Sequence, residues 1–262
     1  MRHHAIRWLT PFLTLAFLFF FAASSTQAKD WYFKPSQNNE PSTTEKEYTD
    51  LLDKYGGVWI GDTSKKIVYL TFDNGYEKGY TAEILDVLKE KHVPAAFFIT
   101  GHYIESAPDL VKRMVNEGHI VGNHSWGHPD LSKISDEDYK EELTKLADAY
   151  TKLTGRHDMI YLRPPQGTFS ERSLKLGEEM GYTSVFWSFA YVDWIDHKKG
   201  ADYAYKSIMR RIHPGAIILL HTVSKDNADV MPRLIDDLRK QGYEFGSLDD
   251  LMLSQHMPSV LD

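Results

Sequence analysis

From residue 65 onward the sequence alternates short hydrophobic runs with amphipathic segments, and this alternation restricts the folds that the chain can adopt. The short runs predict β-strands at 67–72, 95–99, 120–122, 159–162, 184–189 and 216–220. The amphipathic segments predict helices at 81–91, 108–117, 136–154, 171–180, 203–212 and 230–241. Strands that alternate with helices form a parallel sheet covered by helices, as a barrel or as an open sheet. About seven such units in one domain favour the barrel.

The first 28 residues have the composition of a secretory signal peptide. Arg2 and Arg7 supply positive charge before a nearly apolar stretch at 8–23, and small residues precede a cleavage point after Ala28. The apolar stretch is short for a membrane span, which takes about 20 residues, so we expect cleavage. An uncleaved segment would instead tether the protein to the outer face of a membrane. In both cases the remaining chain is secreted or otherwise extracytoplasmic.

The composition of the exported part excludes several classes of protein. The chain has no cysteine, so its hydrophobic core must stabilise it without disulfides. Removal of residues 1–28 takes the formal net charge from −7 to −9, and no basic stripe is present, which argues against a nucleic-acid partner. No glycine-rich nucleotide-binding motif follows a predicted strand, which argues against a nucleotide cofactor. A small molecule, a sugar or a polymer fits this composition better.

The chain divides into a signal peptide and three further parts. Residues 29–64 are polar and turn-rich and form an N-terminal arm and linker, with one short helix within 43–55. Residues 65–253 form the single expected domain, and 254–262 form a C-terminal tail. Aromatic residues make up 13% of the chain, which fits either core packing or a groove that stacks on sugar rings. No heptad pattern or exposed apolar stripe is evident, so we expect a monomer.

Ionisable residues stand where the predicted strands end. They are Asp73, His124, His128, Arg163, Asp193 and His221. Because the carboxyl ends of the strands in a β/α barrel share one face, these side chains are expected to converge. Each has an ordinary structural alternative, such as a tight turn, a surface ion pair, a helix cap or a buried histidine with satisfied hydrogen bonds. Ordinary roles for all of them at equivalent places are a poorer explanation, so we predict an active site.

The predicted site has the groups that metal-assisted amide or ester hydrolysis needs. His124 and His128 are spaced as on one turn of a helix, so one divalent ion can bridge them, polarise a carbonyl and acidify water. Asp73 is the expected general base for that water, and His221 the general acid for the leaving group. Two further residues are expected to tune them: Arg163 lowers the pKa of Asp73, and Asp193 raises that of His221.

These motifs resemble those of the NodB-type polysaccharide deacetylases, the fourth carbohydrate esterase family. The signatures occur in the family's order at 71–75 (Thr-Phe-Asp-Asn-Gly), 124–128 (His-Ser-Trp-Gly-His), 163–167 (Arg-Pro-Pro-Gln-Gly), 193–194 (Asp-Trp) and 219–221 (Leu-Leu-His). The resemblance covers about residues 65–253. It implies a distorted (β/α) barrel, removal of N- or O-acetyl groups from a polysaccharide, and the roles given above. It also implies a substrate pocket shaped by Leu219, Trp194, Pro164 and Tyr191.

One position departs from the family pattern. The family usually has a second aspartate in its first motif, which is the third metal ligand, and here that position is Asn74. An amide in place of a carboxylate removes a negative charge and leaves only a carbonyl dipole. Loss of that ligand bond would weaken metal binding by about a few kcal/mol. The implied divalent cofactor, zinc or another ion, is therefore expected to be weakly held, exchanged for another ion, or absent from the resting protein.

The Asp-Asn-Gly-Tyr-Glu sequence at 73–77 and the export signal look most like the bacterial peptidoglycan N-acetylmuramic acid deacetylases. This resemblance implies glycan strands as the partner and formation of the muramic δ-lactam of spore cortex, in sporulation and germination. A free carboxylate on the muramyl lactyl ether would need a cation, for which Arg163, Arg172 and Lys198 are candidates. Two alternatives stay open: a deacetylase of chitin or xylan, and a carbohydrate-binding protein that has lost its metal chemistry at Asn74.

The remaining histidines are interpreted as structural or surface residues. They are His92, His102, His119, His157, His197, His213 and His256. Of these, His119 is close to the predicted site in sequence, but it precedes a predicted strand by one residue and is expected to face away from the site.

Overall fold

The computed structural model of the protein describes residues 27–38, 40–195 and 199–256. Its main sheet has seven strands in the order β7-β5-β4-β3-β2-β9-β8, with an eighth, β10, beside β2. The bounds are β2 Ile67–Asn74, β3 Ala95–Ile99, β4 Ile120–Asn123, β5 Tyr161–Leu162, β7 Thr183–Ser184, β8 Phe189–Ala190, β9 Ile217–His221 and β10 Glu244–Phe245. Every pairing in this sheet is parallel. The predicted fold class, a distorted barrel of about seven parallel strands, is confirmed as a half-barrel.

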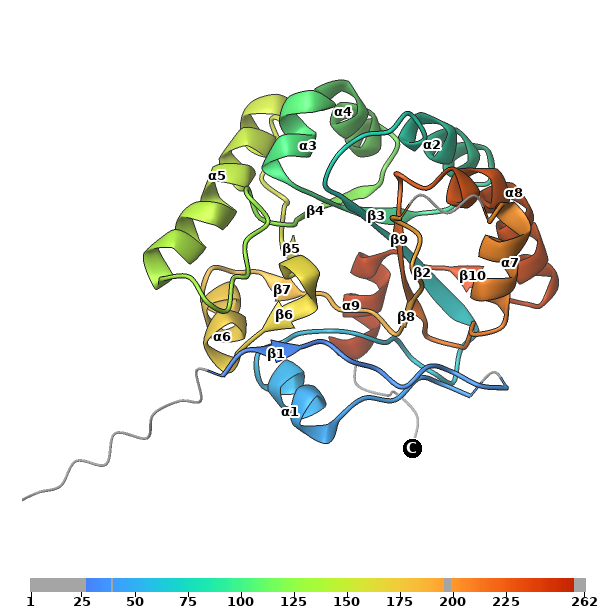
Figure 1. Ribbon diagram of the computed structural model, residues 1–262, viewed down its shortest axis with the longest axis horizontal. Helices are drawn as coiled ribbons and strands as arrows, with labels where there is room; N and C mark the ends of the chain where they lie inside the picture. Colours follow the sequence, from blue (N-terminus) through green and yellow to red (C-terminus); the bar gives the residue numbers. More distant parts are fainter. Residues whose placement is uncertain (1–26, 39, 196–198, 257–262) are drawn as a thin grey trace, which may run out of the picture.

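Most helices lie around the outside of the sheet, whereas α9 lies within the ring of strands (Figure 1), where Leu248 and Leu251 pack against Tyr69 and Phe98. Their bounds are α1 Lys46–Lys54, α2 Thr81–Glu90, α3 Gly101–Ser106, α4 Pro108–Asn116, α5 Asp136–Thr154, α6 Glu171–Glu179, α7 Ala201–Met209, α8 Lys225–Lys240 and α9 Leu248–His256. None of the helices in the described ranges is long and apolar enough to cross a membrane. The proposed signal peptide falls outside the described residues except for its last two positions.

The central strands are buried on both faces, and the alternation of their side chains separates two parts of the core. On β2, Leu70 and Phe72 belong to the larger cluster beneath the helices, whereas Tyr69 belongs to a smaller cluster on the inner face of the sheet. Because side chains alternate along a strand, Asp73 shares the inner face with Tyr69. Asn74 follows the alternation of Leu70 and Phe72. The strand therefore directs these two adjacent polar side chains to opposite faces.

The predicted strand at 184–189 is wrong as a single element. It is two short strands, β7 and β8, at opposite edges of the sheet, and the chain between them crosses the opening of the half-barrel. Val58 fills this opening: its N–H donates to Ser184 O at 2.8 Å, and its carbonyl accepts from Phe186 N at 2.7 Å. Ile60 forms a further bridge to Ala216 beside β9. A segment from the N-terminal part of the chain thus links the two edges.

The predicted arm at 29–64 packs against the barrel. Strand β1, Lys29–Asp30, pairs antiparallel with β6, Thr168–Phe169. The N-terminal aromatic cluster consists of Trp31, Tyr48, Trp59, Phe169 and Phe186. Its centre is Trp31, whose ring centroid lies 4.6 Å from that of Phe186 and whose indole N–H donates to Trp187 O at 2.9 Å. The arm is therefore part of the folded unit.

Three helices differ from the prediction. Helix α8 begins at Lys225, five residues before the predicted start at 230, because Ser224 caps it by accepting from Asn227 N at 3.3 Å. Helix α3 was not predicted. Helix α9 was not predicted either, and it includes residues 254–256 of the predicted tail.

Candidate active site

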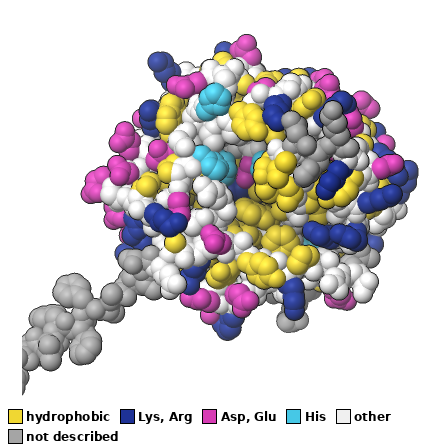
Figure 2. Space-filling view, viewed as in Figure 1, with side chains coloured by type: hydrophobic (Ala, Val, Ile, Leu, Met, Phe, Trp, Pro, Cys, Tyr) yellow, Lys and Arg dark blue, Asp and Glu magenta, His cyan; other side chains and the backbone are white. Residues whose placement is uncertain are grey.

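The predicted catalytic residues meet at the carboxyl ends of the parallel strands. Asp73 lies at the end of β2 and His221 at the end of β9, the neighbouring strand, where the two residues are direct register partners. His124 follows β4, and Arg163 follows β5. Asp73, His124, His128 and His221 all line one cavity of about 680 Å³. Figure 2 shows histidine side chains beside a broad hydrophobic area on this face of the molecule.

Asp73 is buried and paired with a buried cation. Its Oδ1 accepts from Arg163 Nη1 at 2.8 Å, and its Oδ2 lies 3.6 Å from His124 Nε2. Burial by itself raises the pKa of the Asp73 carboxyl, but the positive charges of Arg163 and the nearby histidines outweigh burial and hold the pKa below its usual value. Asp73 is therefore ionised at neutral pH, as a general base must be.

Arg163 is positioned by contacts on all sides. It is fully buried, and its guanidinium lies 4.2 Å from the centre of the Phe98 ring. It donates to Thr71 Oγ1 at 2.9 Å and to Val185 O at 3.1 Å, in addition to Asp73. These bonds aim the guanidinium at the carboxylate and leave it little freedom to reach a ligand.

His124 and His128 lie together, but not on a helix. The run from 124 to 128 is a loop in which Ser125 and His128 have positive φ angles of 65° and 59°. Ser125 Oγ accepts from His128 N at 2.9 Å, and this short bond turns the chain. The imidazole centroids are 4.8 Å apart. The expectation of a helical turn was wrong, although the loop brings the two rings together.

The hydrogen bond of His124 sets its tautomer and leaves Nε2 unprotonated. Its Nδ1 lies 2.7 Å from Arg163 O, and because a carbonyl oxygen only accepts, Nδ1 carries the proton. Burial lowers the pKa of His124 to about 4 and also lowers the pKa of His128. Both rings are therefore neutral at pH 7, the form in which imidazole binds a metal ion.

His221 is held by Asp193. Its Nδ1 lies 2.7 Å from Asp193 Oδ1, and its backbone N–H donates to Asp193 Oδ2 at 2.8 Å. Asn227 also donates to Asp193 Oδ2, at 2.5 Å, which fixes the carboxylate. Burial lowers the pKa of His221, but the hydrogen bond and charge of Asp193 outweigh it, and the net pKa is raised. His221 can thus be protonated where it lines the cavity.

Asn74 does not line the cavity. Its side chain is fully buried, its Nδ2 donates to Thr222 Oγ1 at 2.7 Å, and its Oδ1 has no hydrogen-bond partner in the described part of the chain. No group of three or more His, Cys, Asp or Glu side chains that could hold a metal ion occurs among the described residues. The donors that face the cavity are thus two neutral imidazoles, and the Asn74 amide oxygen lies outside this set as the side chain stands.

The predicted pocket residues divide into two pairs. Leu219 and Trp194 line the cavity, and the Trp194 ring lies 5.1 Å from that of His221. Pro164 and Tyr191 do not line it, contrary to prediction. Pro164 is buried, and the Tyr191 hydroxyl donates to Asn227 Oδ1 behind Asp193 while its ring lines a neighbouring groove. Tyr191 therefore holds Asn227, which in turn bonds Asp193, and it does so from outside the cavity.

Several lining residues were missed by sequence reasoning. They are Tyr76, Thr100, His102, Trp126, Gln166 and Trp187. His102, interpreted above as a structural or surface residue, is the second residue of α3, just after β3 ends. The rule that strand ends supply site residues could have found it. By contrast, His119 is buried against Phe97, with ring centroids 5.4 Å apart, and does not line the cavity.

Comparisons with known proteins agree with this geometry. Residues 60–185 match the family model described as polysaccharide deacetylase. The peptidoglycan-N-acetylmuramic acid deacetylase PdaA of Bacillus subtilis is 46% identical, over 96% of this chain and 98% of the relative. The structure of PdaA, described as a family 4 carbohydrate esterase, superposes with a TM-score of 0.86 and 49% identity, over 88% of this chain and 99% of that chain.

A second solved structure, a family 4 carbohydrate esterase from Bacillus anthracis, is 52% identical with a TM-score of 0.76, over 88% of this chain and 99% of that chain. These matches extend over nearly the whole length of both partners and include the arm as well as the barrel. The family resemblance expected from the five motifs is confirmed. The chain belongs to the polysaccharide deacetylase family, the family 4 carbohydrate esterases.

Proposed function

We propose that this protein removes the N-acetyl group from N-acetylmuramic acid residues of peptidoglycan. The observation that carries the proposal is the pairing of Asp73 with Arg163 and of His221 with Asp193 around one cavity. The first pair lowers the pKa of a carboxyl and the second raises the pKa of an imidazole, which favours the ionised base and the protonated acid that hydrolysis needs. The near full-length similarity to PdaA supports muramic acid as the sugar.

In the proposed reaction, Asp73 accepts a proton from a water molecule as the water oxygen attacks the acetamide carbonyl carbon. His221 then donates a proton to the sugar nitrogen as the carbon–nitrogen bond breaks, and acetate and a free amine leave. Asp193 accepts the hydrogen bond from His221 Nδ1 and so orients the ring throughout. Leu219 offers an apolar surface in the cavity against which the acetyl methyl group can pack.

A divalent ion is part of the proposal. His124 and His128, which both line the cavity, would hold it through ring nitrogens, and the Asn74 amide, bonded to Thr222 outside the cavity, would add no third donor where it now lies. When bound, such an ion polarises the acetyl carbonyl and stabilises negative charge on its oxygen. A donor set without a carboxylate from Asn74 supports weak affinity and a broad choice among zinc and other divalent ions.

The finer biological setting follows from the product. Deacetylation exposes an amine beside the lactyl carboxylate of muramic acid, and these two groups are the ones that a muramic δ-lactam joins. We therefore propose a role in forming the δ-lactam of spore cortex, outside the cytoplasm, after export directed by the N-terminal segment. The partner in this role is the glycan strand of peptidoglycan.

The test is acetate release from purified glycan strands, with and without EDTA and added divalent ions. Release that EDTA abolishes and a metal restores would support both parts of the proposal, and release that ignores EDTA would remove the metal from it. Asp73→Asn and His221→Ala should each lose activity by at least about 10²-fold. Chitin and xylan serve as substrate controls, and faster release from either would replace muramic acid. Glycan binding without acetate release would instead indicate a carbohydrate-binding protein.

A further inference from the structure

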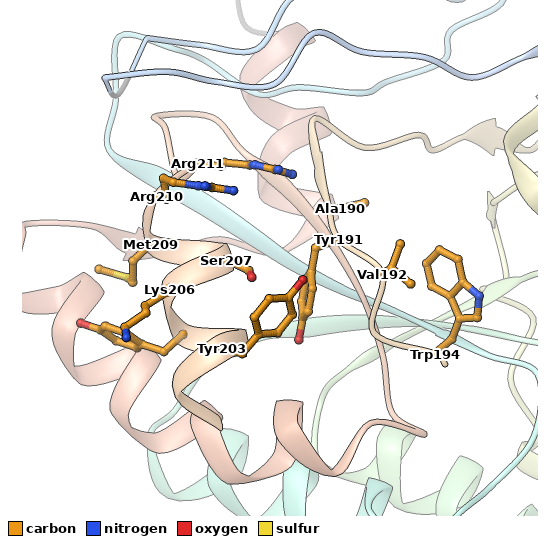
Figure 3. A pocket seen from close by; sticks show the side chains of 11 residues that line it. Ala190, Tyr191, Val192, Trp194, Tyr203, Lys206, Ser207, Met209, Arg210 and Arg211 are labelled. Carbon is orange, nitrogen blue, oxygen red and sulfur yellow. The ribbon is translucent and has the colours of Figure 1, made fainter. Parts of the chain in front are cut away.

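We propose that a groove beside the active cavity binds carboxylate groups of the glycan strand, on sugars beyond the one being deacetylated. This inference rests on the proposed function, because it assumes that the strand enters the active cavity. The groove has a volume of about 980 Å³ and is formed by the segment after β8 and by helix α7. Figure 3 shows it lined by Tyr191, Val192, Trp194 and Tyr203, and by the cations Lys206, Arg210 and Arg211.

The groove and the active cavity share a wall. Trp194 lines both, and its ring lies 5.1 Å from the imidazole of His221. A polymer whose acetamide group reaches His221 can therefore continue past Trp194 into the groove. No other residue lines both hollows in the described part of the chain, which makes Trp194 the boundary between the two subsites.

The apolar wall of the groove is exposed to an unusual degree. Trp194 is 45% exposed, Val192 42% and Tyr203 38%. Large side chains of this kind normally lose more of their surface on folding, and a cluster of them on a surface marks a binding site. Flat aromatic faces also suit sugar rings, which offer apolar C–H groups on one side and hydroxyls at the edge. The wall therefore fits a carbohydrate.

The charge of the groove is one-sided. Lys206, Arg210 and Arg211 line it, and none of the described lining residues is acidic. Figure 3 shows the Arg210 and Arg211 side chains extending in the same direction. The acid on α7, Asp202, forms an ion pair with Arg233 at 3.0 Å. Within the described ranges, no ion pair involves Lys206, Arg210 or Arg211. Three unpaired cations in a chain of net charge −7 point to an anionic ligand.

Of the three cations that the sequence offered for the lactyl carboxylate, the two that the structure describes bind other protein groups. Arg163 is fully buried and bound to Asp73. Arg172 donates to Leu131 O, Ser132 O and Ile134 O and pairs with Asp136, so it holds the loop before α5. Lys198 lies outside the described residues. The described lining of the active cavity contains no Lys or Arg, and the groove is the adjoining place where carboxylates would meet free cations.

Sugars that carry carboxylates fit the aromatic wall and the unpaired cations of the groove better than other anionic ligands do. Nucleic acid would bring a dense line of phosphates against a surface that is acidic elsewhere. A bilayer surface needs cations around an apolar projection, whereas here the aromatic residues and the cations line a concave surface beside a hydrolytic site. Glycan strands of peptidoglycan combine sugar rings with lactyl carboxylates, and they are already the proposed substrate.

The experiment measures binding by titration calorimetry with soluble glycan strands whose stem peptides have been removed. One probe has free lactyl carboxylates, and the other has them converted to methylamides. We expect the wild-type protein to bind the free form at least about 10-fold more tightly, with an affinity that falls as salt rises. The variant Lys206→Gln/Arg210→Gln/Arg211→Gln should lose this preference and bind both probes alike. The matched control Lys34→Gln/Lys140→Gln/Lys152→Gln removes three exposed lysines that do not line the groove and should keep the preference.

Equal affinity of the wild type for both probes, or a groove variant that keeps the preference, would overturn the inference. Loss of binding to phosphatidylglycerol vesicles in the groove variant, without a carboxylate preference on glycan, would overturn it in favour of a membrane surface. Acetate release is measured in parallel. A carboxylate preference without acetate release would support carboxylate binding in the groove and contradict the proposed function. Acetate release without a carboxylate preference would support the proposed function and contradict carboxylate binding in the groove.

Discussion

At the scale of single residues, the ionisation of Asp73 depends on Arg163. The carboxylate is buried, and the guanidinium 2.8 Å away is its closest positive partner. Replacement of Arg163 by Met leaves a buried carboxyl without that charge, so the pKa of Asp73 should rise and the acidic limb of kcat/KM against pH should move to higher pH. At pH 7 we expect kcat/KM to fall about 10²-fold.

The Arg163→Met variant also breaks a buried ion pair, which costs about 3–5 kcal/mol of stability. Activity should therefore be normalised to the folded fraction, measured by circular dichroism. Arg163→Lys is the milder companion, because it keeps the charge but loses the geometry of the guanidinium. An acidic limb that stays in place in folded Arg163→Met would show that another group sets it.

The acid side of the site gives a prediction of opposite sign. Asp193 raises the pKa of His221, so the protonated acid persists to higher pH and is lost as pH rises through that pKa. Asp193→Asn removes the charge, and the alkaline limb of kcat/KM should move to lower pH, with kcat reduced roughly 10²-fold. Titration of the His221 ring by NMR checks the cause directly. An unchanged ring pKa in this variant would contradict the role given to Asp193.

Asn74 permits a gain-of-binding prediction. Asn74→Asp puts a carboxylate at the position where the family has its third ligand. We expect this side chain to turn from Thr222 toward the two imidazoles, which are neutral at pH 7, and an anionic third donor should tighten zinc binding by roughly 10²-fold or more. The measurement is calorimetric titration with zinc at pH 7. The double variant Asn74→Asp/His128→Ala should lose the gain, because the added carboxylate then has one imidazole fewer to work with. Equal zinc affinity in Asn74→Asp and the unaltered protein would show that position 74 does not face the ion.

How far the site could be predicted differs from residue to residue. Asp73, Arg163 and His221 follow from one rule, because parallel strands deliver their carboxyl ends to one face. The placement of Tyr191 and His102 does not follow from it, since each depends on how a connection turns after its strand. Tyr191 turns away to bond Asn227, whereas His102, the second residue of the short helix α3, lines the cavity. Such turns depend on contacts with distant elements that the local sequence does not contain.

At the scale of elements, most local signals were read correctly, although the Ser224 cap of α8 was missed, whereas distant pairings were not predicted. Helix α5 has the predicted bounds of 136–154, because Ser135 caps its start and Gly155, with a φ of 73°, ends it. The run at 184–189 has strand-like composition throughout, yet its middle crosses between sheet edges. What decides this is its partner, Val58, more than 120 positions earlier in the chain. Hydrophobic pattern gives the type of an element but not its partner.

The N-terminal arm offers an element-scale prediction with an adjacent control. Trp31 is 9% exposed at the centre of the N-terminal aromatic cluster, whereas its neighbour Tyr32 is 56% exposed. Trp31→Ala should reduce the free energy of unfolding by about 3–5 kcal/mol, through lost burial and the cavity that remains. For a chain of this length, that corresponds to a fall in Tm of roughly 10 °C.

Tyr32→Ala should change stability by no more than about 0.5 kcal/mol, because it removes a largely exposed ring. Differential scanning calorimetry of both variants makes the comparison. Similar small shifts for the two would show that the arm is only loosely attached and that residues 29–64 act as the linker expected from sequence.

At the scale of the whole molecule, buried histidines couple stability to pH. Burial lowers the pKa of His119, His124, His128 and His213. Each is neutral when folded but gains a proton on unfolding below its ordinary value near 6.5, so the unfolded chain binds more protons and stability falls as pH falls. His221 works in the opposite sense, because its folded pKa is raised. The four histidines with a lowered pKa should outweigh His221, so the free energy of unfolding should fall between pH 7 and pH 5.

His124 alone, with a folded pKa of about 4, should cost on the order of 2 kcal/mol over this interval. Urea unfolding at pH 7, 6 and 5 in the presence of EDTA measures the total without interference from bound metal. We expect the midpoint to fall steadily. A midpoint that stays constant to pH 5 would mean that these histidines remain accessible to protons in the folded state.

His119 allows this effect to be separated from catalysis. Its ring packs against Phe97, away from the active cavity, and neither ring nitrogen has a hydrogen-bond partner in the described part of the chain. His119→Leu keeps an apolar group in that position but removes the titration, so the loss of stability between pH 7 and pH 5 should become smaller while acetate release at pH 7 stays unchanged. Lys140→Gln, on the exposed surface of α5, should leave the full pH dependence in place. An equally steep loss in His119→Leu would assign the acid sensitivity to the site histidines alone, and the stability of the whole barrel would then depend on the protonation of the same rings that prepare its chemistry.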